Sequence, residues 1–290
     1  MLRATLRWTL ILFCLFAIGP AVRILVLRVL DDQGGHAVTL ALNATPGAAV
    51  LAGLAAFGAA GVVGALGAHL FSMGTGLLCA GITLAWARWG LGTVDAMIRQ
   101  EPTGAFRFVF AGENAVALLL TACMAGLFVF LASRRQPAGA QSSSPGGLGA
   151  LVVLGGEYRV KAMLAALAVG LVAGAGMTWL DAISALRGQT LMAVFGGALV
   201  CGAVGQLIAS SMRCTITPVL PVLGMLVVAL AGPILAGAMH GAGLLDASNR
   251  GSLLGLAMPV SLDWAAGSLL GGPIGISWAG AMLDARAVDD

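Results

Sequence analysis

Asp263 is the residue of this chain best placed to do chemistry, because it is a carboxylate isolated in an apolar stretch. It follows Pro259 by four residues, with twelve uncharged residues before it and twenty after it. A carboxylate at the centre of a bilayer costs about 2.5–3.5 kcal/mol on insertion scales, so such a residue usually faces protein or water. A buried Asp263 would suit a site that exchanges a proton or a cation. An Asp263 in a loop at the membrane surface is the alternative, and it would have no such role.

Prolines indicate where backbone groups could become available to an ion or a substrate. A proline inside a helix removes one backbone donor and frees a carbonyl one turn earlier, and broken helices form the substrate sites of many transporters. Kinked packing helices are the alternative interpretation. The prolines in or beside apolar runs are Pro20, Pro218, Pro221, Pro233, Pro259 and Pro273.

The remaining polar residues predict no metal site, no cofactor and no catalytic dyad. The three histidines share no i, i+4 face, and the five cysteines contain no C-x-x-C pair. Asp95 with Arg99, and Asp246 with Arg250, have the i, i+4 spacing of solvated ion pairs. Hydrolase, zinc-protease, Walker and kinase motifs do not occur in the sequence. Enzymatic activity and nucleic-acid binding are therefore not favoured.

Long stretches without charge predict the elements that must hold these residues. The chain is 59% hydrophobic and 9% charged, and residues 33–87 contain no Asp, Glu, Lys or Arg. A helix needs about 20 apolar residues to cross a hydrocarbon core of about 30 Å, and a helix satisfies its own backbone in lipid. We expect an all-α, polytopic transmembrane helix bundle of about eight spans. The expected helices are 8–29, 47–70, 73–94, 113–133, 160–181, 190–211, 217–240 and 252–283, the last long enough to contain a break or a re-entrant piece.

A stretch rich in serine, glycine and proline divides the chain into two blocks. Such a composition, at residues 134–158, is typical of a flexible linker. The sequence predicts a four-helix membrane block at 1–133 and a second block, with the proline-broken helices, at 159–290.

Basic residues near the helix ends set the expected orientation. With eight spans, Arg134 and Arg135 lie on the same side as both termini, and the positive-inside rule places that side in the cytoplasm. Arg23 and Arg28 then fall outside, so the basic residues are nearly balanced between the two sides. The expected location is the cytoplasmic (inner) membrane of a bacterium.

Arg88 is flanked by two aromatic residues at the end of the third expected helix. Trp86 and Trp89 on either side of a cation are typical of an interfacial anchor. The pattern therefore predicts Arg88 at the membrane surface, with a buried charge as the alternative.

Glycine repeats predict close packing between helices. A glycine every three residues drifts by about 60° per step around a helix, so small residues cover about half of its surface. Neighbouring backbones can then approach closely on more than one side. A role in conduction or sliding is the alternative. The glycines concerned are Gly58, Gly61, Gly64 and Gly67 in the second expected helix and Gly170 and Gly174 in the fifth.

A short region resembles the pore helices of the ExbB/TolQ/MotA proton-channel family. That family places threonines at positions like Thr93 and Thr121, with an acid one turn before the second. Val116 occupies that position here, Glu113 lies three residues further back, and the family's large cytoplasmic insertion is missing. The resemblance implies a proton path that includes Glu113, Thr93 and Thr121. It is carried by Gly92-Thr93-Val94, residues 115–122 and Gly126-Leu127.

The predicted spans, the proline-broken second block and Asp263 favour a transporter-like permease or a membrane subunit of a larger complex. Its ion or substrate pathway would consist of Asp263, Pro259, Glu113, Thr93 and Thr121. A non-catalytic structural or assembly subunit, with glycine faces that dock partner helices, is the alternative, and a proton-channel component is a more remote one. The expected partners are the lipid bilayer and either other membrane subunits or further copies of the chain.

Overall fold

The predicted all-α bundle is confirmed. The computed structural model describes residues 2–31, 34–39, 44–100, 106–134 and 156–289. These residues form helices and connections without a β-strand, and an isolated antiparallel bridge joins Leu30 to His36. The helices are α1 (Leu2–Phe13), a π-helical turn (Cys14–Ile18), α2 (Gly19–Val26), α3 (Pro46–Leu70), α4 (Met73–Arg88), α5 (Val94–Gln100), α6 (Phe106–Ser133), α7 (Gly156–Asp181), α8 (Arg187–Ser211), α9 (Val219–His240), α10 (Leu244–Asn249) and α11 (Ser261–Asp289).

Among the described residues, seven helical stretches are long and apolar enough to cross a membrane. They are Leu2–Val26, Pro46–Leu70, Phe108–Ser133, Val160–Asp181, Arg187–Ser211, Val219–Asn249 and Ser261–Leu283. The eighth expected span is α4, which ends at Arg88 and not at residue 94. Its 16 residues extend for about 24 Å, less than the hydrocarbon thickness. This shorter helix is largely enclosed, because it packs against α2, α3, α6 and α11.

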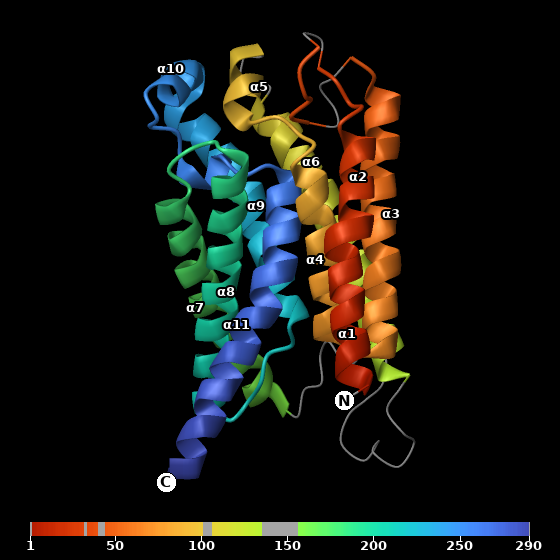
Figure 1. Cartoon of the computed structure of the whole chain (residues 1–290). Coiled ribbons are helices and arrows are strands. Elements are labelled where there is room, and N and C mark those ends of the chain that lie inside the picture. The colour runs from red at the N-terminus through yellow and green to blue at the C-terminus, as the bar shows by residue number, and fades with distance from the viewer. Residues whose placement is uncertain (1, 32–33, 40–43, 101–105, 135–155, 290) are drawn as a thin grey trace.

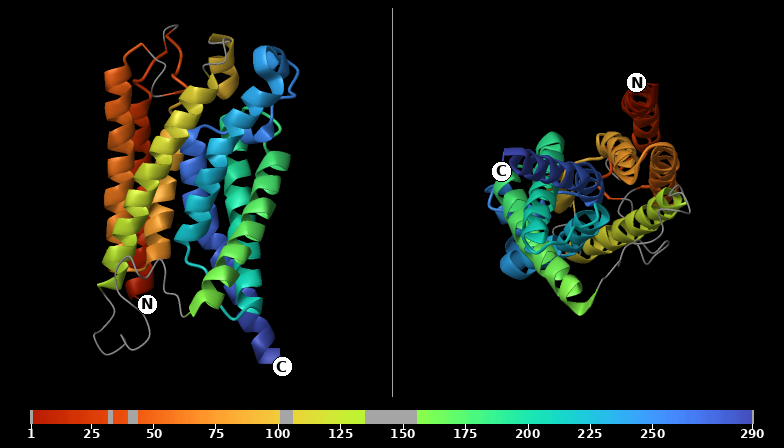
Figure 2. Two further views of the ribbon diagram at one scale, coloured as in Figure 1. Left: turned by 180° about the vertical axis from the view of Figure 1, so that it is seen from behind. Right: turned by 90° about the horizontal axis from the view of Figure 1, so that it is seen from below.

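The two predicted blocks lie side by side in the bundle. Helices α1 to α6 occupy one side and α7 to α11 the other, as their colours show in Figures 1 and 2. The last helix, α11, joins them, because it packs extensively against both α8 and α4. Both chain ends lie at one end of the bundle, where α6 also ends and α7 begins (Figure 1). Most of the expected linker falls outside the described residues, and its last residues, 156–158, already belong to α7.

The expected helix 252–283 begins later than predicted, just before Asp263. A 3₁₀ turn at Gly255–Ala257 is followed by residues 258–260, which are not α-helical, and α11 begins only at Ser261. Pro259 favours this break, because a proline has no backbone N–H group to donate within a helix. The non-helical piece is mostly buried and packs against α7 and α9. Irregular backbone can lie within a membrane protein when it is enclosed by protein in this way.

The predicted glycine rows occupy different environments. A Cβ atom added at Gly64 would collide with the Phe128 ring, and one at Gly67 would lie 3.0 Å from the Gly76 Cα atom. At Gly61 the added atom would make an ordinary contact, and at Gly58 it would meet nothing within 4 Å. One edge of this row therefore lies against α4 and α6, whereas Gly58 is open.

The G-x-x-x-G motif of α7 lies against α8. An added Cβ atom would approach the Cys201 carbonyl oxygen to 2.6 Å at Gly170, and the Gly197 carbonyl oxygen to 2.6 Å at Gly174. Backbones that approach so closely leave no room for a side chain at either position.

Asn114 compensates for a proline in the neighbouring helix. Pro233 lies inside α9, where it cannot donate to the carbonyl of Ala229 one turn earlier. The Asn114 Nδ2 atom of α6 donates to that carbonyl oxygen at 2.7 Å, and Asn114 is fully buried. A contact between helices thus satisfies the group that the proline leaves without a helical partner.

We expect Asn114→Val to lower the free energy of unfolding by about 1–3 kcal/mol, because the Ala229 carbonyl would lose its donor. The loss should be much smaller in a Pro233→Ala background, where the amide at position 233 can donate within the helix. Unfolding of the four proteins in detergent, followed by circular dichroism, measures this coupling. Equal losses in both backgrounds would contradict it.

Candidate functional site

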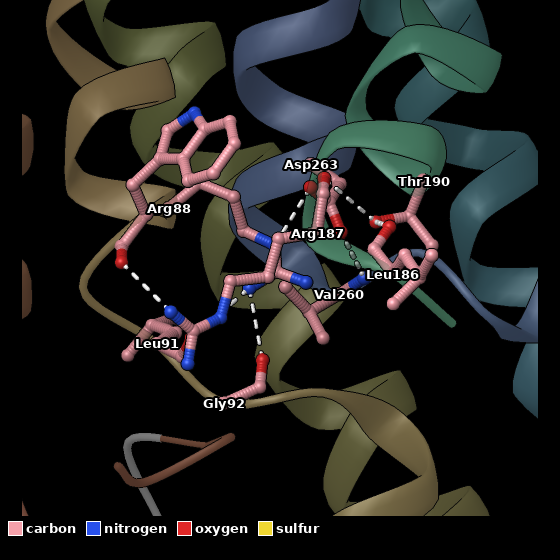
Figure 3. A network of polar contacts seen from close by, with 9 residues as sticks. Arg88, Leu91, Gly92, Leu186, Arg187, Thr190, Val260 and Asp263 are labelled. Carbon is pink, nitrogen blue, oxygen red and sulfur yellow. Dashed lines mark hydrogen bonds and ion pairs between the residues drawn. The ribbon is translucent and has the colours of Figure 1, made fainter. Parts of the chain in front are cut away.

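A buried ion pair between the two blocks is the principal polar feature of the bundle interior. The Arg88 Nε atom, at the end of α4, donates to the Asp263 Oδ1 atom, in the first turn of α11, at 2.7 Å. Both side chains are completely buried. The pair joins residues 175 positions apart in the sequence, and Figure 3 shows it between the two helix ends.

Arg88 also binds the chain that follows α4. Its Nη1 atom donates to the carbonyl oxygen of Gly92 at 2.9 Å, with a longer contact of 3.4 Å to that of Leu91. These bonds fold residues 89–92 back over the guanidinium group (Figure 3). The Arg88 Nη2 atom is buried and has no hydrogen-bond partner. The guanidinium group therefore has one donor group left for a further acceptor.

Asp263 holds the start of α11 while it pairs with Arg88. Its Oδ2 atom accepts a hydrogen bond from the backbone N–H of Val260 at 3.0 Å. This contact is one half of a capping box, in which an acid in the first turn accepts from the residue that precedes the helix. The Thr190 side chain of α8 forms a further hydrogen bond with the carboxylate (Figure 3). A negative charge is favoured at this position because the N-terminus of a helix carries partial positive charge.

A loop from the first block covers the pair. The backbone N–H of Gly92 donates to the carbonyl oxygen of Ala37 at 2.9 Å, and Ala37 is buried. Val38, next to it, lies so close to Gly92 that an added Cβ atom would approach its Cγ2 atom to 2.8 Å. Glycine at position 92 therefore lets the loop close over the bonds that Arg88 makes.

The structure corrects the expectation for Arg88 and gives the surroundings of Asp263 and Pro259. Arg88 is not at an interface: it is completely buried, whereas Trp89 beside it is 43% exposed. The tryptophans therefore mark the surface near the pair, and the cation points inward. Asp263 is completely buried in the first turn of α11, close to one end of that span. Pro259 is buried in the non-helical piece just before α11.

The other predicted pathway residues lie in separate places. Thr93 lies in the connection between α4 and α5, outside any helix. Thr121 is buried in α6, and its hydroxyl has no hydrogen-bond partner. Glu113, also in α6, lines a cavity of about 430 Å³ between α3, α6 and the start of α11. Ser261 lines the same cavity, which therefore ends two residues from Asp263.

Two residues of the site, Thr190 and Arg88, were not predicted to belong to it from the sequence. Thr190 carries no distinguishing sequence signal, because one threonine in a long apolar helix is unremarkable. Arg88 carries a stronger one: it ends a long charge-free run, as Asp263 interrupts another. A lone cation and a lone anion in apolar segments are natural partners, because each is costly to bury alone.

The arrangement suits charge compensation between two buried side chains. No group of three or more His, Cys, Asp or Glu side chains that could hold a metal ion occurs among the described residues. Comparison with protein-family models, curated proteins and solved structures gave no significant match. The long apolar helices define a multi-pass α-helical integral membrane protein.

Proposed function

We propose that this protein is a transporter-like permease in which the Arg88–Asp263 pair is the site of ion exchange. The observation that carries the proposal is a completely buried ion pair at the start of a membrane helix, next to a buried non-helical connection. Ionisable residues within membrane domains commonly mark ion and substrate pathways.

The contacts of the pair suggest how exchange would proceed. A proton that binds the Asp263 carboxylate neutralises it and leaves Arg88 without its counter-ion. The Arg88 Nη2 atom already lacks an acceptor, so the freed guanidinium group would attract an anionic group. Loss of the proton would restore the pair and release that group. Binding of a proton and of an anion would thus be coupled at one site.

A step in pH applied to proteoliposomes on a solid-supported membrane tests this proposal. The wild-type protein should give a transient charge displacement when Asp263 binds a proton. The double variant Arg88→Gln with Asp263→Asn should remove it, because its two amides can keep a hydrogen bond without titrating. Asp246→Asn is the matched control, because Asp246 is exposed and belongs to a surface pair with Arg250. An unchanged displacement in a folded double variant would contradict the proposal.

We place the protein in the cytoplasmic membrane of a bacterium, with both termini in the cytoplasm. Both chain ends lie at the same end of the bundle as the end of α6 and the start of α7 (Figure 1). This arrangement supports the proposal that they lie on one side of the membrane. Single cysteines introduced at Ser143 and Asp290 in a cysteine-free background should react with an impermeant maleimide only after the cells are broken. Labelling of either position in intact cells would contradict this orientation.

A structural subunit is the second candidate, and the outer surface of the first block favours it. Added Cβ atoms at Gly58 of α3 and at Gly112 and Gly126 of α6 would meet nothing within 4 Å. These helices could receive partner helices at close range. Purification in a mild detergent distinguishes the candidates: constant stoichiometry with other subunits favours the structural role, and a lone homo-oligomer favours transport.

A further inference from the structure

A groove between α2, α4 and α11 is lined mainly by apolar side chains and by one cation, Arg23. Its volume is about 540 Å³, and its lining includes Arg23, Trp86, Trp89 and Leu270. We refer to it as the Arg23 groove. We propose that the Arg23 groove binds the phosphate of an anionic membrane phospholipid.

Uncompensated positive charge is the first reason. Arg187 and Arg23 both lie beside the end of α4, because Arg187 binds the Trp89 carbonyl oxygen and Arg23 packs on the Trp86 ring. Asp263 compensates Arg88, but none of the described residues forms an ion pair with Arg23 or Arg187. Clustered arginines at the edge of a membrane domain attract anionic headgroups, and basic pockets between helices bind them.

The Arg23 side chain is oriented for such a ligand. Its guanidinium carbon lies 6.0 Å from the centre of the Trp86 ring, a cation–π arrangement that restrains it. Its Nε atom is buried and has no hydrogen-bond partner. A phosphate can accept two parallel hydrogen bonds from one guanidinium group. Arg187 contacts the backbone of Trp89, a lining residue, because its Nη1 atom donates to the Trp89 carbonyl oxygen at 3.2 Å.

The surroundings fit a lipid better than a soluble anion. Trp89 is 43% exposed at the groove, and tryptophan prefers the level of the lipid headgroups. Exposed apolar side chains of the N-terminal span, among them Phe16 and Ile24, lie along the same helical stretch as Arg23. Acyl chains could lie on this surface while the phosphate occupies the groove. This proposal does not depend on ion exchange at Asp263.

Lipid binding to the full chain in detergent tests the proposal. Phosphatidylglycerol should stay bound in native mass spectrometry and raise the midpoint of thermal unfolding, and phosphatidylcholine should do neither. Arg23→Gln should weaken phosphatidylglycerol binding about tenfold or more, because a charge-assisted hydrogen bond is lost. Arg28→Gln is the matched control, because Arg28 is exposed and near the same helix end.

Three results would overturn the proposal. They are equal retention of the two lipids, unchanged binding by Arg23→Gln, and equal stabilisation by inorganic phosphate, which would indicate a site for soluble anions. Should Arg23→Gln fail to fold, Arg187→Gln provides the comparison with Arg28→Gln. Weaker phosphatidylglycerol binding by Arg187→Gln alone would support the site, and equal binding would refute it.

Discussion

Arg88→Leu is expected to lower the free energy of unfolding by about 3–5 kcal/mol, because removal of one partner leaves a buried charge uncompensated. Asp263→Leu should cost at least as much. It would leave Arg88 unpaired and would also remove the acceptor of the Val260 N–H group at the start of α11. Either single variant should show a lower midpoint of unfolding in detergent.

The double variant Arg88→Leu with Asp263→Leu should recover much of this loss. When both charges of a buried pair are replaced by apolar groups, the change is often neutral or stabilising. The Val260 N–H group and the Leu91 and Gly92 carbonyls would still lack partners, so recovery should be incomplete. A double-mutant cycle of unfolding midpoints measures the coupling. Strictly additive losses would show that the two side chains contribute independently.

Gly64→Leu is expected to be the most disruptive glycine substitution in α3. A side chain at this position would collide with the Phe128 ring and would stand against the Gly76 backbone, which cannot rotate away as a side chain can. Overpacking typically costs about 1–3 kcal/mol and more where no neighbour can move. We therefore expect a low yield of folded protein and a clear decrease in the unfolding midpoint.

Gly58→Leu is the matched control, because Gly58 lies in the same helix and faces open space. Its effect should stay within about 0.5 kcal/mol, as for other surface substitutions. Thermal unfolding of both purified variants in one detergent makes the comparison. Equal midpoints would show that the close contact between α3, α4 and α6 is not required for stability.

Much of the fold could be predicted from charge spacing alone. Unpaired charges and unsatisfied backbone groups are costly in lipid. A long charge-free run is therefore compatible with few structures other than a spanning helix. The expected helix 47–70 therefore agrees closely with α3 at Pro46–Leu70. The predicted end of the third helix at residue 94 was wrong. Arg88 binds the carbonyls of Leu91 and Gly92 and thereby stabilises a turn where apolar residues continue.

The site was only partly predictable, because its central contact is a tertiary one. Asp263 could be selected from its isolation in an apolar stretch. The two neighbouring tryptophans predicted its partner Arg88 at the membrane surface. In the structure Trp89 is partly exposed, whereas the Arg88 side chain is buried. Helical periodicity describes one helix at a time. Which face of α4 meets the start of α11 depends on packing between segments far apart in the chain.

The separation of the two charges in the sequence has a consequence for biosynthesis. Asp263, in α11, is synthesised 175 residues after Arg88. Until then, Arg88 in the inserting chain has no counter-ion. Helix α4 also lacks its contacts with α11. A ribosome that stops before Ser261 would release a membrane protein with this charge uncompensated. Only a chain that includes α11 can therefore form this ion pair.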